Sequence, residues 1–558
     1  LGSIGLVDET PPLFAASART MAESGDWLIP QVNGLPRYDK PPLVYWLMAA
    51  FYSLPGQHFW DPWGSWSAGL PSALASGGTL LLLCLLTAWW ERRVLGQPQG
   101  LWLVAGLLYG LSPLVMLWSR IGVSDSLLTA LVALAMVSSW CSFTSPRVPW
   151  WLCWLALGLA TLTKGPVALV LFGLCWAGYA LLEQNVSRVW QRLRPLPGVL
   201  VSLVVAAPWY VVVFWREGTP FVESFFGYHN LQRFTQVVNR HASPWWFYGA
   251  MLLVASLPWS PLVLLGLWRG LRRGQSLARF AACWLLAVLL LFSLSATKLP
   301  SYWLPATPAA GLLVALAAQR GGQRWSWTLT LLLTAVLAAG WLASPLWVPL
   351  IVAPELPGLV PQLLAGRWLL LGGFLYALAV VLTLGLGRYG GAVALLGLQG
   401  PLWAFVPLVL QPAWELGDRL RGQPVREMAA VLVRQARPAE PVAMVGMLKP
   451  SLHYYGRRVV IYEGAEPHHL VNLADRLRTE SRPGQPASTP EAQPTVLVVI
   501  DAGTAGQAHW QGLAPQPLAR SGIYGLWRLD RRQLEQRAQQ LRRQGVAADW
   551  RLPRPERY

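Results

Sequence analysis

Charged residues are scarce in this chain. Asp, Glu, Lys and Arg make up 13% of its 558 residues, whereas hydrophobic residues make up 54%. This balance is typical of a membrane protein and excludes a large soluble enzyme. The chain also has no Asp-x-Asp motif of the kind that holds a nucleotide sugar diphosphate, and no Walker sequence. We therefore do not expect a nucleotide donor.

Cysteine is also rare, and its placement excludes two further classes. The five cysteines lie in apolar segments without the spacing of metal sites (Cys84, Cys141, Cys153, Cys175 and Cys283). We interpret them as free packing residues, so no disulfide framework is expected. The stretch GLGRYG at 385–390 matches a dinucleotide fingerprint, but it falls between two apolar segments instead of between a strand and a helix. A nucleotide site there is not expected.

Long apolar runs dominate the rest of the chain. About twelve segments near the bilayer-spanning length begin roughly at residues 68, 100, 126, 150, 165, 197, 247, 278, 302, 326, 368 and 390. The two at 150 and 165 are short, so the count could be one too high. Many of the 33 tryptophans stand at segment ends, as in interfacial aromatic belts. Because the first residues are expected outside without a signal peptide, we also expect a thirteenth, N-terminal span ahead of this sequence.

Basic residues are more frequent in every second loop, and this pattern predicts the orientation in the membrane. The richer loops, which should be cytoplasmic, contain Arg92, Arg93, Arg147, Arg188, Arg192, Arg194, Arg269, Arg272, Arg273, Arg320, Arg324 and Arg388. The opposite loops, the N-terminal segment and everything after 411 then lie on the outer face. This predicts an integral plasma (inner) membrane protein whose catalytic face is extracytoplasmic or periplasmic. The net charge of +18 is explained by positive-inside loops and anionic membrane lipids, so nucleic acid is not an expected partner.

Three regions follow from the change in pattern. Residues 1–67 are predicted to be an external catalytic segment with a helix at PPLFAASARTMAES and an interfacial stretch at PPLVYWLMAAFYSL. Residues 68–411 form an all-α polytopic membrane bundle. Residues 412–558 form a small extracytoplasmic α/β domain, with a helix at REMAAVLVRQAR, strands at PVAMVGM, RVVIYEG and PTVLVVIDAG, and a basic helix at RRQLEQRAQQLRRQG. The pair His468 and His469 is expected in a surface loop.

Five ordered motifs stand on the predicted outer face. They are DET…ESGDWLIPQVNGLPRYDKPPLVYW, SRIGVSDSLL, LTKGPVAL, FFGYHNLQRF…RHASPWWFY and TKLPSYWLPATPA. Together they resemble the aminoarabinose transferases of lipid A modification and the related protein O-mannosyltransferases, which are multi-span glycosyltransferases of the GT-C class. PSLHYYGRRVV in the C-terminal domain resembles the first of these groups less specifically. The resemblance implies inverting transfer of a sugar from a polyprenyl phosphate to a hydroxyl or phosphate acceptor.

That chemistry needs a base for the acceptor and cations for the departing phosphate. By resemblance, Asp8 matches the family's proposed base, with Glu9 beside it, and Lys40 matches the lysine that contacts the lipid phosphate. The residues themselves leave alternatives open. Asp8 and Glu9 precede prolines and could cap a helix, and Lys40 could reach out to lipid headgroups.

Further charged residues recur near the predicted outer boundary. Arg120 and Asp125 could contact substrate or pair with each other. Lys164 and Lys298 could each bind a phosphate, with Tyr302 donating a hydrogen bond, or could be positioned ligands for lipid headgroups.

One histidine and one arginine in YHNLQRF complete the candidate set. His229 and Arg233 would share a helix face. Arg233 is expected to bind substrate, and His229 could bind a divalent metal with Asp39 or a neighbouring carboxylate, or make an ordinary hydrogen bond. No cofactor is required by the sequence.

Two questions stay open at this stage. The family commonly has basic and aromatic residues after the acidic pair, whereas this chain has Thr10, Pro11 and Pro12, so the acceptor could be a glycolipid such as lipid A or a protein hydroxyl. The second hypothesis is a lipid-linked sugar transporter or flippase without transferase activity, since charges beside spans also mark translocation paths. Clustering of the ionisable motifs at one face favours transfer.

Overall fold

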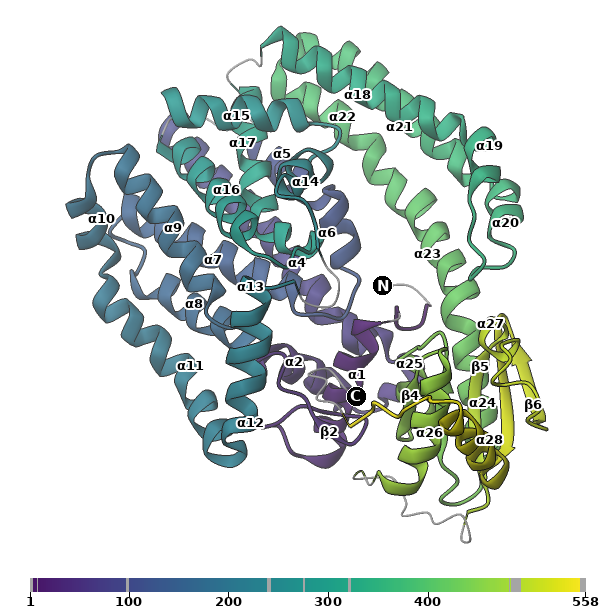
Figure 1. Cartoon of the computed structure of the whole chain (residues 1–558). Helices are drawn as coiled ribbons and strands as arrows, with labels where there is room; N and C mark the ends of the chain where they lie inside the picture. Colours follow the sequence, from purple (N-terminus) through teal and green to yellow (C-terminus); the bar gives the residue numbers. More distant parts are fainter. Residues whose placement is uncertain are drawn as a thin grey trace.

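The computed structural model describes residues 4–7, 9–96, 100–237, 242–273, 276–319, 323–480, 482 and 493–551. Asp8, Arg320 and most of the stretch RPGQPASTPEAQP lie outside these residues. A helical bundle fills most of the molecule, and a sheet domain lies at one end of it (Figure 1). The predicted combination of a polytopic helical membrane fold and a C-terminal α/β domain is therefore confirmed.

Eight helices in the described part of the chain are long and apolar enough to cross a membrane. They are Ser65–Leu95 (α4 with η1), Asp125–Thr144 (α7), Val186–Glu217 (α10 with α11), Ser276–Leu294 (α16), Pro300–Gln319 (η3 with α17), Arg324–Leu342 (α18), Trp368–Tyr389 (α21 with η5) and Gly391–Gln435 (α22 through α24). The chain is thus an integral membrane protein with multiple spans.

The expected count of about twelve spans is higher than this. Three of the predicted segments are the shorter helices Leu101–Gly110 (α5), Trp151–Lys164 (α8) and Val167–Leu182 (α9), and a fourth is divided into Phe247–Val254 (α14) and Ser260–Arg273 (α15). Proline explains the breaks, because it cannot donate the helical hydrogen bond. Pro113 begins the separate helix Pro113–Trp118 (α6) after α5, and Pro166 separates α8 from α9.

The bundle has a buried centre and an exposed periphery. The apolar window of Pro300–Gln319 is 94% buried within the protein, whereas that of Arg324–Leu342 is only 22% buried. Small residues permit this close packing. A Cβ added at Gly266 of α15 would stand 2.5 Å from the carbonyl oxygen of Leu313 in α17, so any larger residue there would push the two helices apart.

The C-terminal domain is a five-stranded mixed sheet with strand order β4-β3-β5-β7-β6. The strands Val442–Val445 (β3), Val460–Glu463 (β4) and Thr495–Asp501 (β5) are parallel and correspond to the three predicted ones. The antiparallel pair Gln516–Ser521 (β6) and Tyr524–Asp530 (β7) was not predicted. The helices of the domain are Gln423–Gln435 (α24), Ser451–Gly456 (α25), Pro467–Thr479 (α26), Ala502–Ala505 (α27) and Arg531–Arg543 (α28).

The N-terminal segment lies between the bundle and this domain (Figure 1). Helix α1 (Thr10–Ser24) is the predicted one, and it packs on Leu43–Tyr52 (α2), α4 and α25. A short hairpin, Gln31–Val32 (β1) and Leu35–Pro36 (β2), connects the two helices. The remaining short helices are Gln57–Trp60 (α3), Thr219–Val222 (α12), Glu223–Gln232 (η2), Arg233–Thr235 (α13), Ser344–Trp347 (α19), Val348–Leu350 (η4) and Leu359–Ala365 (α20).

Candidate functional site

The residues around Lys40 form a compact charged group. Arg37 donates two hydrogen bonds of 2.6 Å to the two carboxylate oxygens of Asp39, and Tyr45 donates a third at 3.1 Å. The Lys40 ammonium donates to the Asp39 backbone carbonyl at 2.7 Å and lies 3.9 Å from its carboxylate. The guanidinium of Arg37 also lies 4.8 Å above the ring of Phe14 in α1. Arg37 therefore occupies most of the carboxylate and leaves Lys40 less tightly held.

Burial and neighbouring charges set the protonation of this group. Burial raises the pKa of Asp39, but Arg37 and Lys40 outweigh it and the net shift is downward, so Asp39 is ionised. Burial lowers the pKa of Lys40 to about 8, and the positive charges of Arg233, Lys164 and Arg37 act in the same direction against Asp39. A bound anion would stabilise the charged form of a lysine that has several cations near it.

Helices α7 and α8 bring a second pair to the same region. Lys164, at the C-terminus of α8, donates a 2.6 Å hydrogen bond to Asp125 at the start of α7. Its ammonium lies 4.9 Å above the ring of Tyr302. Asp125 therefore pairs with Lys164, a partner that was not expected, and the pair considered between Arg120 and Asp125 is absent among the described contacts. The five-residue spacing did not reveal that α8 ends beside α7.

The YHNLQRF and TKLPSY motifs are joined by backbone hydrogen bonds. The amide of Thr297 donates to the carbonyl of Arg233 at 3.2 Å, and that of Ala296 donates to Phe234 at 2.9 Å. Lys298 is buried and donates to the carbonyl of Ser295 at 2.6 Å. Arg233 and Lys298 therefore lie on adjoining segments, and the charge of Arg233 reaches Lys40.

His229 is buried in η2 beside the charged group. Burial, and after it the charge of Lys40, lower its pKa to about 3 against the opposing charge of Asp39. No group of three or more His, Cys, Asp or Glu side chains able to hold a metal ion occurs within the described ranges. Asp39, the partner considered for a metal, is already bound by Arg37. The metal-binding role of His229 stays a prediction.

Glu9, which follows the predicted base Asp8 in the chain, and Arg120 are both described by the structure. Asp8 itself lies outside the described residues. Glu9 is largely exposed, makes no capping hydrogen bond to α1, and pairs with Arg421 at 2.8 Å. Arg120 lines a small pocket with residues 4–7 and Gly122. It makes no ion pair with the acidic side chains that the structure describes, and its guanidinium donates a hydrogen bond to the carbonyl of Met116 at 3.4 Å.

A larger cavity of about 490 Å³ opens between the N-terminal segment and the helices that lead to the C-terminal domain. Ile4 and Trp63 line one side. Glu415, Asp418 and Arg426 line the other, together with Arg419, Gln423, Glu427 and Ala430. The cavity is therefore lined by one aromatic side chain, Trp63, and mostly by polar and charged side chains.

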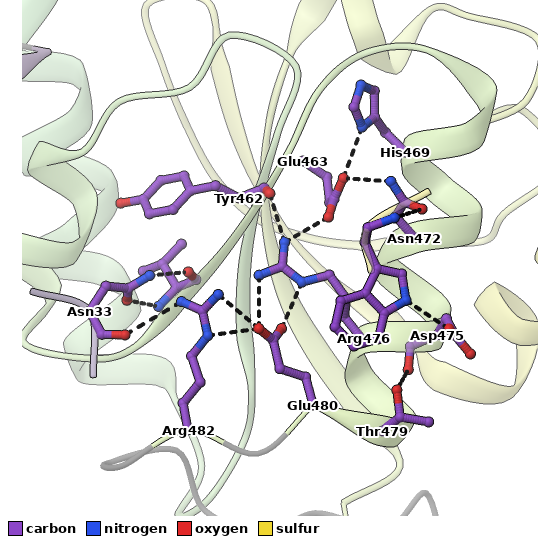
Figure 2. Close-up of polar contacts among 12 residues, drawn as sticks. Asn33, Tyr462, Glu463, His469, Asn472, Asp475, Arg476, Thr479, Glu480 and Arg482 are labelled. Carbon is purple, nitrogen blue, oxygen red and sulfur yellow. Dashed lines mark hydrogen bonds and ion pairs between the residues drawn. The ribbon is translucent and has the colours of Figure 1, made fainter. Parts of the chain in front are cut away.

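Sequence reasoning missed a buried charge network in the C-terminal domain. Figure 2 shows Arg476 between two carboxylates, bound at 2.6 Å to Glu463 and at 2.6 Å to Glu480, with Arg482 on the far side of Glu480 at 2.8 Å. His469 donates to Glu463 at 2.8 Å when its Nδ1 is protonated. The expectation that His468 and His469 lie in a surface loop is wrong, because both belong to α26. A helix of mixed charge gives no signal that one arginine points inward.

Comparison with known proteins agrees with this geometry. Residues 39–212 match the family of dolichyl-phosphate-mannose-protein mannosyltransferases, and residues 435–545 match the C-terminal domain of cyanobacterial RgtA-type glycosyltransferases. The crystal structure of ArnT from Cupriavidus metallidurans bound to undecaprenyl phosphate superimposes with a TM-score of 0.75 over 94% of each chain, at 23% identity. The chain therefore has the ArnT fold, and parts of it match two glycosyltransferase families.

Curated members of the family are more similar in sequence. Undecaprenyl phosphate-α-4-amino-4-deoxy-L-arabinose arabinosyl transferases from Pseudomonas paraeruginosa and Pseudomonas fluorescens are 32% and 33% identical over 317 and 324 residues. Each alignment covers 55% of this chain and 54% of the relative, so the chain spans about half the length of the curated relatives that it matches. The resemblance expected from the motifs is thus confirmed at the level of the family.

Proposed function

We propose that this protein transfers a sugar from a polyprenyl phosphate, such as undecaprenyl phosphate, to an acceptor at the outer face of the membrane, with inversion. One observation carries the proposal: Lys164 and Arg233, from two distant segments, act electrostatically on Lys40, and the carboxylates beside these cations among the described residues are Asp39 and Asp125. Such an excess of cations in a partly buried site suits the phosphate of a lipid-linked donor.

The chemistry assigns a role to each group. Asp8 removes the proton from the acceptor oxygen, which attacks the anomeric carbon from the face opposite the phosphate. The bond between the anomeric carbon and the phosphate oxygen breaks, and its electron pair stays with the polyprenyl phosphate. Lys40, Arg233 and Lys298 stabilise the negative charge that grows on this leaving group. Lys164, oriented by Asp125 and placed over Tyr302, completes the cationic wall.

The remaining candidates belong to the acceptor side. Glu9 follows the proposed base in the chain, Arg120 lines a pocket with residues 4–7, and Arg421 orients the carboxylate of Glu9. An acceptor carrying hydroxyl or phosphate groups suits this mixture of charges. We favour a glycolipid such as lipid A over a protein hydroxyl, because the motifs resemble the aminoarabinose transferases of lipid A modification and the similar curated proteins are named as 4-amino-4-deoxy-L-arabinose transferases. The reaction needs no metal in this scheme.

Asp8→Asn tests the base directly. The substitution keeps size but removes basicity, so transfer should fall by about 10²- to 10⁴-fold, the usual contribution of a general base. The measurement is the rate at which radiolabelled sugar passes from undecaprenyl phosphate to lipid A in proteoliposomes. Glu23→Gln, which changes an exposed carboxylate of α1, is the matched comparator and should retain most of the activity. Full activity of Asp8→Asn would remove Asp8 from this role.

The transporter hypothesis predicts a different outcome in the same vesicles. A flippase would move labelled polyprenyl-phosphate sugar between leaflets without forming a covalent product. Covalent transfer without net flipping supports the enzyme, and flipping without transfer would overturn the proposal. Mass spectrometry of envelope lipids and exported proteins, from cells with and without the chain, identifies the acceptor.

A further inference from the structure

Asn33 connects the N-terminal segment to the C-terminal domain through an unusually complete set of hydrogen bonds. Its side-chain amide donates to the carbonyl of Val460 at 2.8 Å and accepts from the amide of Val460 at 2.8 Å. Its backbone amide donates to Nε2 of His453 at 3.0 Å, and its carbonyl accepts from Arg482 at 3.4 Å. In each of these bonds, Asn33 and its partner lie more than 400 residues apart in the chain.

The amide of Asn33 takes the place of a neighbouring strand. Val460 is the first residue of β4, which is the edge strand of the sheet and pairs with β3 on its other side. The second edge of a strand presents unpaired amide and carbonyl groups. Asn33 satisfies both groups at Val460, and it is itself 2% exposed. The hairpin is therefore fixed to the sheet edge as an additional strand would be.

The residue type fits the backbone at this position. Asn33 has a φ of 54° in the turn between β1 and β2. Asparagine adopts this left-handed conformation more readily than most residues with a side chain. The carbonyl is then directed toward Arg482, which belongs to the buried network of Figure 2. Because that network holds its charges in a closed set of contacts, the anchor for the hairpin is rigid.

The hairpin leads directly into the charged group of the candidate site. The β1–β2 register ends at Pro36, and the amide of Arg37 donates to the carbonyl of Pro30 at 2.7 Å across the base of the hairpin. Arg37 then binds Asp39, whose carbonyl accepts from Lys40. A displacement of the turn at Asn33 would thus be transmitted through a short, hydrogen-bonded path to the Lys40 ammonium.

We propose that Asn33 is a positioning residue through which the C-terminal domain holds Lys40 in place for the phosphate of the lipid donor. This inference rests on the proposed function, since it takes Lys40 to bind that phosphate. The domain then contributes to donor binding without touching the donor, by fixing the hairpin that precedes Lys40. The catalytic role of the sheet domain is indirect and acts through geometry.

The test is binding of undecaprenyl phosphate to the full-length protein in nanodiscs. Asn33→Gly keeps the left-handed turn but removes the amide. The turn would then no longer be fixed to the sheet edge, and the Kd for undecaprenyl phosphate should rise about tenfold. Asn33→Asp keeps the acceptor for Val460 and should show a smaller rise. His453→Gln is a second variant on the opposite side of the contact, should Asn33→Gly fail to fold.

A matched control lies in the same interface. Glu23 of α1 pairs with Arg457 of the C-terminal domain at 3.3 Å, and both side chains are exposed. Glu23→Gln removes this contact without touching the hairpin and should leave the Kd unchanged. In transfer assays, Asn33→Gly should raise the donor KM about tenfold while kcat changes less than about threefold.

The outcomes separate the inference from the function. A lower fraction of binding-competent protein with an unaltered Kd would mean that Asn33 is merely structural, and would overturn the inference. Parental protein that binds undecaprenyl phosphate but transfers no sugar would overturn the proposed function alone, since the Kd comparison still decides the role of Asn33. Parental protein that binds no undecaprenyl phosphate would overturn both.

Discussion

Two charged clusters in this molecule differ in their balance. The network of the C-terminal domain combines Glu463 and Glu480 with Arg476 and Arg482, two charges of each sign, and direct contacts link its members. The cluster at the N-terminal segment sets four cations, Arg37, Lys40, Lys164 and Arg233, against two carboxylates among the described residues, Asp39 and Asp125. The first cluster is complete by itself, whereas the second has positive charge in excess.

The difference separates a structural from a binding role. A buried charge is tolerated where partners neutralise it and satisfy its hydrogen bonds. The C-terminal network meets this condition, so removing one member should cost stability. Among the described residues, the cluster around Lys40 has more cations than carboxylates, so an anion would improve its electrostatics and removing a cation should cost binding instead. Each prediction below tests one side of this contrast.

The largest expected effect is on stability, at Arg476. Arg476→Leu leaves Glu463 and Glu480 buried without their shared cation, and breaking such a pair typically costs about 3–5 kcal/mol. The free energy of unfolding of the full-length protein in detergent, from denaturant titration, is the measurement. Arg478→Gln is the matched control: it lies on the same helix, is half exposed, and should change stability by less than about 0.5 kcal/mol.

The pH dependence of this variant has a definite sign. Burial raises the pKa of Glu463, but His469 and Arg476 outweigh it in the parental protein and the net shift is downward. Without Arg476, burial should raise the pKa of the folded state above that of the unfolded state. Stability is then retained at low pH and lost as pH rises through the raised pKa, so the deficit should be smaller at about pH 5 than at about pH 7.5. An equal deficit at both would contradict the network's role.

A smaller effect, on binding instead of stability, is expected at Lys40. Lys40→Ala should weaken donor use about ten- to a hundredfold, because a charge-assisted contact to phosphate is worth about 1.5–3 kcal/mol. Lys40→Arg keeps the charge and should lose less. The free energy of unfolding should stay unchanged or rise slightly, because the variant removes one of several neighbouring positive charges. Parental kinetics in Lys40→Ala would mean that this lysine only contacts lipid headgroups.

The smallest effect is a dependence of donor binding on pH. With a pKa of about 8 in the unliganded protein, Lys40 loses its proton as pH rises through that value, so the donor KM should increase above about pH 8, up to tenfold per pH unit. Asp39 and His229 do not interfere, because their lowered pKa values keep them ionised and neutral respectively in this range. Lys40→Arg should abolish the increase. The same rise in that variant would assign the titration to another group.

The sequence predicted the fold well where one physical signal dominates. Apolar runs placed the bundle helices, and short apolar strands placed β3, β4 and β5. It overestimated the number of spans, because average hydropathy does not register breaks between helices. Pro166, between α8 and α9, marks one such break. It missed β6 and β7 because polar and charged residues such as Arg520 and Arg528 interrupt their apolar residues, and β6, as the edge strand, needs little burial.

The site was predictable in composition but not in pairing. Lys40, Lys164 and Arg233 were identified from motifs, and the structure brings their charges together. The partner of Asp125 was not predictable, because Lys164 lies 39 residues away and reaches it only through the packing of α8 on α7. Asn33 had no visible signal, since an asparagine before glycine reads as an ordinary turn. Only the docking of a distant domain gives this residue its contacts.

One long helical element, Gly391–Gln435, runs from the bundle into the C-terminal domain (Figure 1). At 1.5 Å per residue its 45 residues extend roughly 65–70 Å, of which the hydrocarbon core of a bilayer takes about 30 Å. The rest is a spacer of fixed length. It sets the height of the sheet edge above the membrane, and hence the level at which the hairpin and Lys40 are held. If Lys40 binds the lipid donor as proposed, a membrane too thick or too thin for this spacer would move the phosphate of the donor away from Lys40. The rate of transfer should therefore depend on bilayer thickness.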